Sequence, residues 1–554
     1  MKNIYYWPVV ILSLLISSCG KKNNPPPTNP PASFSMNTLK VNGIYNGYTY
    51  RGLNTKPVVK ISFSSALDPN SVSGSVAFTS KTGAAVTYSA TYENNDSTMV
   101  ITPSATLQNL SQYTLAVSTG LQSSKKGSLG SAISVQLNTA IDSTDKFPQI
   151  SDDALLTLIQ QQTFKYFWDF GHPVSGLARE RNTSGDVVTM GGSGFGIMSI
   201  VVGTNRGFIT RAQGLARMQT IVGFLLNNAQ KFHGAFPHWM NGVSGAVVPF
   251  STQDDGADLV ETAYLMEGLL TARQYFNDPG TAETTLRNNI NTLWNGVEWD
   301  WFRQNGQNTL YWHWSPDYGW STGQQIAGWN EALITYVLAA SSNTHSVPKA
   351  VYDNGWAQNG QMKNGSSYYG ITLPLGPVEG GPLFFAHYSF MGINPNGLSD
   401  AYASYDVQNK AHAMINYDYC TANPQNYYGY SNECWGLTAS DVPNGYNANS
   451  PTSDLGVIAP TAAIASLPYT PAQSMAALHF FYYKLGDKLW GQYGFYDAFD
   501  LDNPWFASSD LAIDEGPIIC MIENYRSGLL WNLFMSCPEV KTGMKNLSFQ
   551  SPNL

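Results

Sequence analysis

The property that this chain has least of is charge. Only 12% of its 554 residues are charged, against about 25% in an average soluble domain. The net charge is −9 and nothing in the sequence forms a basic stripe. We therefore expect no nucleic-acid partner, because binding to phosphates needs clustered lysine and arginine. Beyond residue 20, no apolar run is long enough for a transmembrane helix.

Several catalytic motifs are also missing. Neither H-E-x-x-H nor G-x-S-x-G occurs, which argues against a metalloprotease or an esterase. The glycine-rich run Gly191–Gly196 lacks a P-loop lysine and a strand-to-helix unit, so it does not predict a nucleotide site. It precedes a predicted helix, and we expect close backbone packing or sugar contact there. No metal and no cofactor are expected.

Cysteine is scarce, with five in the whole chain. Apart from Cys19, none of the spacings resembles a zinc site. Cys420 and Cys434 are the most plausible local disulfide, because an even number of cysteines in an exported protein permits bridges. Free buried thiols are the alternative for these two and for Cys520 and Cys537.

The first residues predict export. Lys2 precedes a short apolar run that ends at Cys19, so residues 1–19 are read as a lipoprotein signal peptide whose cleavage leaves Cys19 lipidated on a membrane. An ordinary secretory peptide is the alternative. Residues 20–32 are rich in proline and asparagine and predict an extended linker. We expect an outer-membrane lipoprotein, on the periplasmic face or the cell surface.

The rest of the chain divides into two predicted domains. Residues 33–140 show period-two alternation in Val58–Phe63, Ser97–Thr102 and Tyr113–Val117, which is typical of an Ig-like β-sandwich. Residues 141–150 are a predicted linker. Residues 151–554 carry helical periodicity separated by long aromatic loops. About a dozen helices joined in this way favour an all-α (α/α)6 toroid around a loop-lined cleft.

One acidic segment stands out in the helical part. Asp254, Asp258 and Glu261 are spaced i, i+4 and i+7, which predicts one face of a helix over Gly256–Phe276. Carboxylates crowded beside apolar side chains repel one another, so some of their pKa values should rise. The alternative is a helix start with acids that complement its dipole.

Aromatic residues are abundant, including 15 Trp and 32 Tyr. Several loops repeat the theme of an acid or a histidine among aromatic residues. Tryptophan rings stack on sugar faces while polar side chains bind hydroxyls. The residues we expect to bind substrate are Arg179, His238, Trp239, His313, Trp314, Trp320, His387, Tyr388 and Trp435.

Two carboxyl groups are needed to hydrolyse a glycosidic bond, one to protonate the leaving oxygen and one to activate water or attack carbon. We predict Glu331 as the general acid, because it starts a helix beside Trp329. We predict Asp514 as the general base, just before a helix that opens at Pro517, with neighbouring Glu515 as the alternative. Helix capping is the competing explanation for both positions. The supporting acids would be Asp254, Asp258, Glu261 and Glu433.

Residues from about 150 to 545 resemble the glycoamylase-like domain of Bacteroidetes lipoproteins. The resemblance is carried by the segments Thr189–Gly196, Phe236–Trp239, Asp254–Ala263, Gly328–Glu331 and Tyr430–Gly436. It points to glycoside hydrolase family 144, which implies an α/α toroid acting on β-1,2-glucans with inversion. An Ig-like domain ahead of the toroid is similar to members that release sophorose, and endo or exo action stays open. We expect a monomer whose partner is a polysaccharide or oligosaccharide substrate.

Two other functions remain compatible with the sequence. A non-catalytic glycan-binding lipoprotein would need the tryptophan loops but not the converging acids. A polysaccharide lyase would need a tyrosine or histidine base with a cation that neutralises a uronate, whereas the motifs here are acidic.

Overall fold

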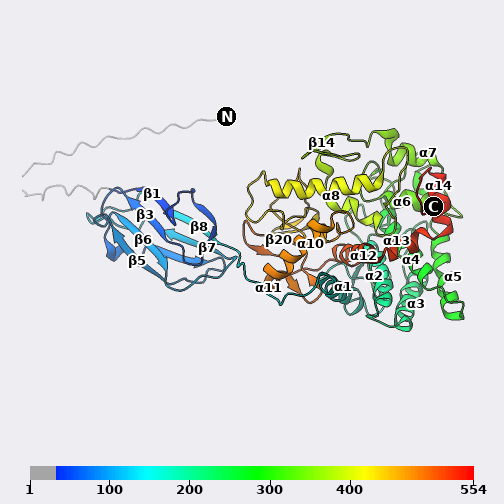
Figure 1. The fold of residues 1–554 in the computed structure, drawn as a ribbon, viewed down its shortest axis with the longest axis horizontal. Coiled ribbons are helices and arrows are strands. Elements are labelled where there is room, and N and C mark those ends of the chain that lie inside the picture. Colours follow the sequence, from blue (N-terminus) through cyan, green and yellow to red (C-terminus); the bar gives the residue numbers. More distant parts are fainter. Residues whose placement is uncertain (1–32) are drawn as a thin grey trace, which may run out of the picture. The chain divides into compact units, whose positions relative to one another are not determined.

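The computed structural model describes residues 33–554, so Cys19 and the predicted signal peptide and linker lie outside the described residues. The chain forms two compact units: the first ends at Leu137, and the second comprises the remainder together with residues 51–55 and 108–112. Figure 1 shows strands in the first unit and mostly helices in the second. Within residues 33–554, no helix combines the length and the apolar character that crossing a membrane requires.

The first unit is a sandwich of two four-stranded sheets, ordered β1-β3-β6-β5 and β2-β8-β7-β4. Alternate residues of β3 and β7 are buried, because side chains of a strand point to opposite faces. The three strands predicted from period-two alternation are found as β3, β6 and β7. The strands are β1 (Met36–Val41), β2 (Thr49–Leu53), β3 (Val59–Phe63), β4 (Val76–Ser80), β5 (Tyr88–Glu93), β6 (Thr98–Pro103), β7 (Gln112–Val117) and β8 (Ile133–Thr139).

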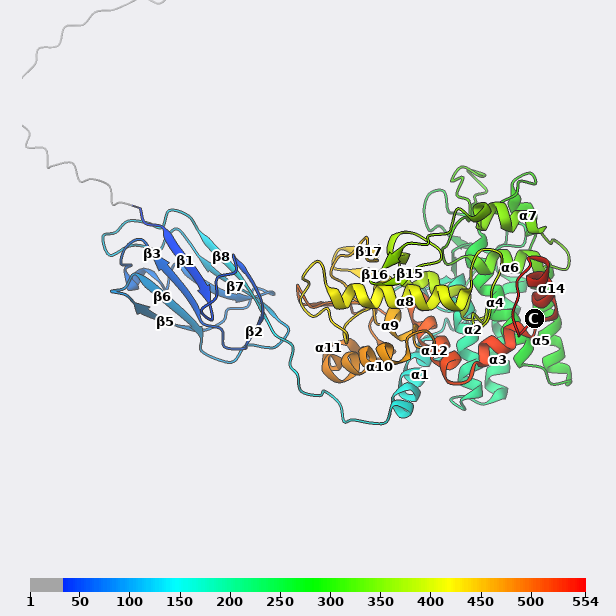
Figure 2. The same ribbon diagram turned by 45° about the horizontal axis from the view of Figure 1, so that its top comes forward.

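The second unit is mainly helical. Its helices are α1 (Asp152–Trp168), α2 (Met190–Asn205), α3 (Arg211–Asn227), α4 (Leu259–Tyr275), α5 (Thr281–Asn295), α6 (Leu333–Ser341), α7 (Lys349–Val351), α8 (Tyr405–Ala422), α9 (Pro460–Ile464), α10 (Pro471–His479), α11 (Gly486–Leu489), α12 (Ala512–Ser527), α13 (Leu529–Met535) and α14 (Pro538–Asn546). Helix α2 packs against both α4 and α12, and the three lie side by side in both views (Figures 1 and 2).

The glycine-rich run does not precede a helix as predicted but forms the first turns of α2, which is buried from Met190 to Gly203. Glycine is required there by a close helix crossing. A Cβ on Gly194 would lie 2.1 Å from the carbonyl oxygen of Tyr264, and one on Gly268 would lie 2.2 Å from the carbonyl oxygen of Gly194. Of the two expectations for this run, backbone packing therefore holds at Gly194.

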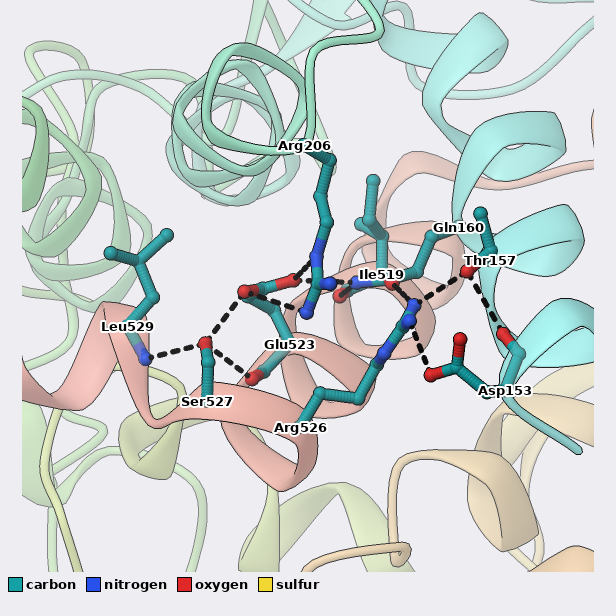
Figure 3. A network of polar contacts seen from close by, with 9 residues as sticks. All are labelled: Asp153, Thr157, Gln160, Arg206, Ile519, Glu523, Arg526, Ser527 and Leu529. Carbon is teal, nitrogen blue, oxygen red and sulfur yellow. Dashed lines mark hydrogen bonds and ion pairs between the residues drawn. The ribbon is translucent and has the colours of Figure 1, made fainter.

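A buried ionic network joins three helices of this unit (Figure 3). Glu523 of α12 is fully buried and binds the Arg206 guanidinium through Nε at 2.7 Å and Nη2 at 3.1 Å. Gln160 of α1 donates to the same carboxylate at 3.0 Å, and Arg526 donates to the Gln160 amide oxygen at 2.8 Å. Because every group has a partner, the network clamps α1, the end of α2 and α12 without a buried unpaired charge.

The cysteines of the described residues are all free and buried: Cys420, Cys434, Cys520 and Cys537. The predicted Cys420–Cys434 bridge is therefore wrong, and the alternative of buried thiols holds. Burial raises the pKa of the Cys434 thiol well above its ordinary value, so these groups behave as small apolar side chains rather than nucleophiles.

Candidate active site

Short strands bring the predicted acids and histidines together. Strand β12 (Ala257–Asp258) pairs with β13 (His313–Trp314), and the register puts Asp258 directly opposite His313. Strand β10 (Trp239–Asn241) lies between β9 (Val187–Thr189) and β11 (Val247–Val248). The carbonyl of His238, just before β10, accepts the N–H of Met190 at the start of α2. Pairing between distant segments therefore places both histidines beside one acid.

The three acids of the 254–261 segment do not share one helix face, as their spacing predicted. Helix α4 begins at Leu259, and Asp258 is its N-cap, accepting the N–H groups of Val260 and Glu261 at 3.0 Å each. Asp254 lies in the preceding turn, and Glu261 lies in the first turn. Asp258 therefore caps the helix instead of lying on its face, because a buried helix start needs an acceptor for its free N–H groups.

The residues that meet here are named the histidine–carboxylate cluster: His238, Asp254, Asp258, Glu261 and His313. Asp258 is fully buried and receives Nδ1 of His238 at 3.0 Å and Nε2 of His313 at 3.4 Å. The same His313 nitrogen lies 3.3 Å from Asp254. Glu261 accepts the backbone N–H of Gly191 at 2.7 Å, so the start of α2 also contributes to the cluster.

The surroundings lower the pKa of one of these acids, Asp258, and raise that of another, Asp254. Burial alone would raise the pKa of Asp258, but hydrogen bonds from His238 and His313 outweigh it and hold that pKa below its ordinary value. Burial and the charge of Asp258 raise the pKa of Asp254 to about 6. Although burial opposes it, the charges of Glu261 and Asp258 raise the pKa of His238 to about 9. The cluster thus holds an anionic Asp258 against a protonated His238, and the neighbouring carboxylates also raise the pKa of His313.

One group of ligand atoms in the cluster has dimensions that suit a metal ion. His238, Asp254 and Asp258 each offer an atom within 4.8 Å of the others. As long as His238 keeps the proton that the anions stabilise, its Nδ1 is a donor and not a ligand. These three residues would hold a divalent cation only after that proton is lost.

Glu331 lies before α6 and is half-buried. Its backbone carbonyl accepts the hydroxyl of Tyr264 at 3.3 Å and also that of Ser389. Burial, with the charges of Glu261 and Asp258, raises the pKa of its carboxyl to about 7. A carboxyl group that keeps its proton near neutrality and remains partly accessible is suited to general acid catalysis.

The second group of acids is built around α12. Asp514 and Glu515 lie in the first turn of this helix, which begins at Ala512, so Pro517 is inside the helix and does not open it as predicted. Leu511 pairs with Arg181, and the N–H of Ala512 donates to the carbonyl of Glu180 at 3.0 Å. The carboxyl cluster consists of Asp497, Asp510, Asp514 and Glu515, all of them buried.

Burial keeps protons on this second cluster. It raises the pKa of Asp497 and of Asp510 to about 7. Burial and the charge of Asp497 raise the pKa of Asp514 well above its ordinary value, and burial does the same for Glu515. The pair formed by Asp497 and Asp514 therefore binds a proton more tightly than an exposed carboxyl group does.

A cavity of about 530 Å³ opens beside the carboxyl cluster. Arg181 lies 3.2 Å from Asp441 and 2.9 Å from Glu180. The backbone N–H of Asp441 donates to Asp497 at 2.6 Å, and the Ser509 hydroxyl donates to Asp441 at 2.6 Å. The cavity is lined by Arg181, Asp441, Tyr446, Trp505, Phe506 and Ser509, among others. It combines aromatic rings with ionic groups, as sugar-binding pockets do.

Tyr388 connects the two clusters. Its pKa is raised well above the ordinary value by burial and by the charges of Asp514, Glu331 and Glu261. Its ring packs on Phe195 at 5.3 Å between centroids. Asp514, Glu331 and Glu261 come from distant parts of the sequence, and their charges all act on the pKa of this one phenol.

Other predicted substrate-binding residues lie elsewhere. Trp435 is fully buried and donates its indole N–H to the carbonyl of Gln473 at 3.2 Å. His387 is also buried, with its Nε2 at 3.0 Å from the hydroxyl oxygen of Ser466, and burial lowers its pKa to about 3. Both are core residues, so assigning them to substrate was wrong: an aromatic-rich segment has the same composition whether it faces a cleft or a core.

Arg179, predicted to bind substrate, and Glu433, predicted as a supporting acid, have other surroundings in the structure. The guanidinium of Arg179 lies over the ring of Phe170, 4.5 Å from its centroid. Glu433 is exposed on a turn. It is Arg181, two residues after Arg179, that binds acids at the cavity.

Trp314 and Trp320 belong to an aromatic group around Trp301. Their ring centroids lie 5.4 Å and 4.7 Å from that of Trp301. Both remain half-buried. The predicted Trp239 is half-buried as well and lies next to the ring of Phe250, at 4.8 Å.

Several site residues were missed from the sequence. Asp497 follows two aromatic residues in Phe495-Tyr496-Asp497, the same pattern of an acid among aromatics that indicated other loops. Arg181 lies in a charged segment of which only Arg179 was predicted to bind substrate. Asp441 and Asp510 carry no comparable local pattern, and only the tertiary structure brings Asp441 into the cavity lining and Asp510 to Asn182, which also lines it.

Comparisons with known proteins place these observations in a family. A family model described as "Putative glucoamylase" matches residues 323–538, and a "Bacterial Ig-like domain" model matches residues 46–139. An exo β-1,2-glucooligosaccharide sophorohydrolase from Parabacteroides distasonis is 44% identical over 443 residues, which cover 75% of this chain and 61% of that protein. The chain thus spans less than two thirds of that relative.

Two solved structures match over their whole length. A "putative glucoamylase" from Bacteroides uniformis is 56% identical, with a TM-score of 0.73, and the match covers 74% of this chain and 100% of that chain. An endo-β-1,2-glucanase from Chitinophaga pinensis, solved with sophorotriose and glucose, is 50% identical, with a TM-score of 0.72 and coverage of 73% and 100%. The chain therefore belongs to the glycoamylase-like family that contains the β-1,2-glucanases of glycoside hydrolase family 144.

Proposed function

We propose that this protein is a glycoside hydrolase that cleaves β-1,2-glucan or its oligosaccharides, either by releasing sophorose or by endo cleavage. The observation that carries the proposal is Glu331, a half-buried acid whose pKa is raised to about 7 beside two further carboxylates. The relatives that act on β-1,2-linked glucose supply the linkage.

In the proposed reaction Glu331 donates its proton to the glycosidic oxygen as the bond from that oxygen to the anomeric carbon breaks. A water molecule attacks the carbon from the opposite face, which inverts its configuration, and gives its proton to a carboxylate. A carboxylate of the pair formed by Asp497 and Asp514 takes that proton, and because the pKa values of both acids are raised, this base is ionised only as the pH rises. In this scheme Asp514 remains the proposed base, with Asp497 as the group that tunes it.

The same proposal extends to the architecture, as an (α/α)6 toroid. It is supported by the chain of packed helices in which α2 meets α4 and α12, α4 meets α6, α6 meets α14, and α12 meets α1 and α9. The starts of α2, α4 and α12 and the segment before α6 all carry site residues. A ring of helices whose starts face one cleft would place them in this way, and the positive ends of the helices would support acids there.

The decisive experiment incubates the protein with linear β-1,2-glucan and measures new reducing ends, with α-1,4-glucan as the matched comparison. Sophorose as the sole early product would indicate exo action, and a mixture of chain lengths would indicate endo action. Proton NMR of the first product should show the α-anomer if the configuration inverts. A protein that binds β-1,2-glucan without producing reducing ends would be a glycan-binding protein instead.

We also propose export as an outer-membrane lipoprotein anchored through Cys19, and a monomeric catalytic unit. The basis is the apolar leader that ends at Cys19 and the proline-rich segment after it. Mass spectrometry of the mature N-terminus should find an acylated Cys19, and Cys19→Ser should release the protein from membranes. Light scattering at known concentration tests the monomer.

A further inference from the structure

A half-exposed aromatic ring lies beside the histidine–carboxylate cluster. Phe250 is 50% exposed, and its ring stacks on His238 with 4.2 Å between centroids and 29° between planes. His238 in turn bonds Asp258 at 3.0 Å. A single imidazole thus separates the phenylalanine ring from the most deeply buried acid of the cluster.

The backbone holds this ring in place. The N–H of Phe250 donates to the carbonyl of Asp254 at 2.9 Å, so the ring and one cluster acid belong to the same tight turn. Strand β11, just before it, pairs Val248 with Trp239, and the indole of Trp239 meets the phenylalanine ring at 63°. One face of Phe250 is therefore covered by His238 and one edge by Trp239, while half of the residue stays open to solvent.

A fixed, open aromatic face next to charged groups matches what a pyranose ring needs. The C–H face of a sugar packs on the aromatic ring while its hydroxyls bond to ionic side chains. We propose that Phe250 is the stacking platform of a sugar-binding subsite adjoining the histidine–carboxylate cluster, and that contact with it makes longer glucan chains better substrates. This inference rests on the proposed hydrolase function.

The test compares Phe250→Ala and Phe250→Tyr with the wild-type protein on β-1,2-gluco-oligosaccharides of increasing length. We expect Phe250→Ala to lower kcat/KM for long chains about tenfold through KM, with a smaller loss on the shortest cleaved chain, and Phe250→Tyr to restore the preference because it keeps the flat ring. The matched control is Val243→Ala, another exposed apolar residue of the same region, 49% exposed, which should keep the wild-type length profile.

Binding is measured in parallel, from tryptophan fluorescence, because Trp239 adjoins the ring. Weaker binding of long chains by Phe250→Ala, with an unchanged melting temperature, would support the platform. An unchanged length profile in an active variant would overturn the platform and leave the hydrolase function intact. A change in oligomeric state without a change in KM would show that the ring is a protein contact. A wild-type protein that neither cleaves nor binds any β-1,2-glucan would overturn both proposals.

Discussion

The histidine–carboxylate cluster and the carboxyl cluster both contain buried acids, and they differ in whether histidines bind those acids. In the first, His238 and His313 hold the pKa of Asp258 below its ordinary value. In the second, burial raises the pKa values of Asp510 and Asp514. The nearby Arg181 forms its ion pairs with Glu180 and Asp441. The charge of a buried acid is thus decided by which cation reaches it.

The contrast also explains how one site can both donate and accept protons. Glu331 lies next to the histidine–carboxylate cluster, whose charges help to keep its proton in place. Asp514 lies in the carboxyl cluster, where burial and the charge of Asp497 raise its pKa, so its carboxylate binds a proton tightly once it receives one. Different environments for two carboxyl groups are the arrangement that acid–base catalysis requires.

The strongest test of this comparison removes the acid. Glu331→Gln should lower kcat by about 10²–10⁴-fold, because the amide cannot protonate the leaving oxygen. In the wild type, kcat/KM should fall as pH rises through about 7, since the acid then loses its proton. Glu433→Gln, which changes an exposed glutamate, should keep near-normal turnover. Normal kcat in Glu331→Gln would end the assignment of the acid.

The next test addresses the carboxyl cluster. Asp514→Asn should lower kcat by about 10²-fold or more, since the pair can no longer accept the proton of water. Glu515→Gln distinguishes the roles of these two adjacent acids, and it should lower kcat less than Asp514→Asn if Asp514 is the base. Rates on a good leaving group, such as an aryl glycoside, should recover in Glu331→Gln but not in Asp514→Asn. A larger loss in Glu515→Gln would reverse the assignment.

A third variant perturbs the histidine–carboxylate cluster without removing a charged side chain. A Cβ on Gly191 would lie 2.6 Å from Oε2 of Glu261 and 2.9 Å from the ring of Tyr264, so Gly191→Ala should displace that carboxylate. We expect about tenfold lower kcat and a shifted alkaline limb, because Glu261 acts on the pKa of Glu331. Gly223→Ala in α3, where a Cβ meets nothing within 4 Å, is the matched control. Unchanged kcat in Gly191→Ala would separate Glu261 from catalysis.

The smallest expected effect is on stability. Asp497 and Asp510 have pKa values raised to about 7, so the folded protein binds their protons more tightly than the unfolded chain does. Their stabilising contribution is complete below about pH 4 and is lost as pH rises through about 7. Denaturant unfolding should show the free energy of unfolding falling as pH rises across this window. Asp510→Asn should flatten the slope, whereas the exposed Asp317→Asn should not.

Local patterns were sufficient where one physical effect dominates. The alternation in Val58–Phe63 predicts β3 because one side of that strand is buried and the other is half-exposed. The helical periodicity after residue 150 predicts a mainly helical second unit, and helices such as α3, which starts with a capping box of Thr210 and Gln213, form it. The position beside Trp329 indicated Glu331, and the spacing of the acids indicated Asp258, before any contact was known.

Local patterns failed where two effects compete at short range. The spacing of Asp254, Asp258 and Glu261 fits a helix, but the free N–H groups of α4 needed an acceptor and took Asp258 as their cap. The low helix propensity of glycine predicts a loop at Gly191–Gly196, yet this run is helical. The close packing of α2 against α4, which only glycine permits, offsets the unfavourable helix propensity there.

The sequence by itself determined that this is a two-part protein of a known family, poor in charge and rich in aromatic residues, because composition, periodicity and motifs are local properties. Only the tertiary structure decided which acids share a site and which of them carry protons. Asp441, Asp497 and Asp514 come together from separate segments, and His238 reaches Asp258 across twenty residues. A pKa depends on burial and on charges within a few ångströms, and those distances exist only once the chain has folded.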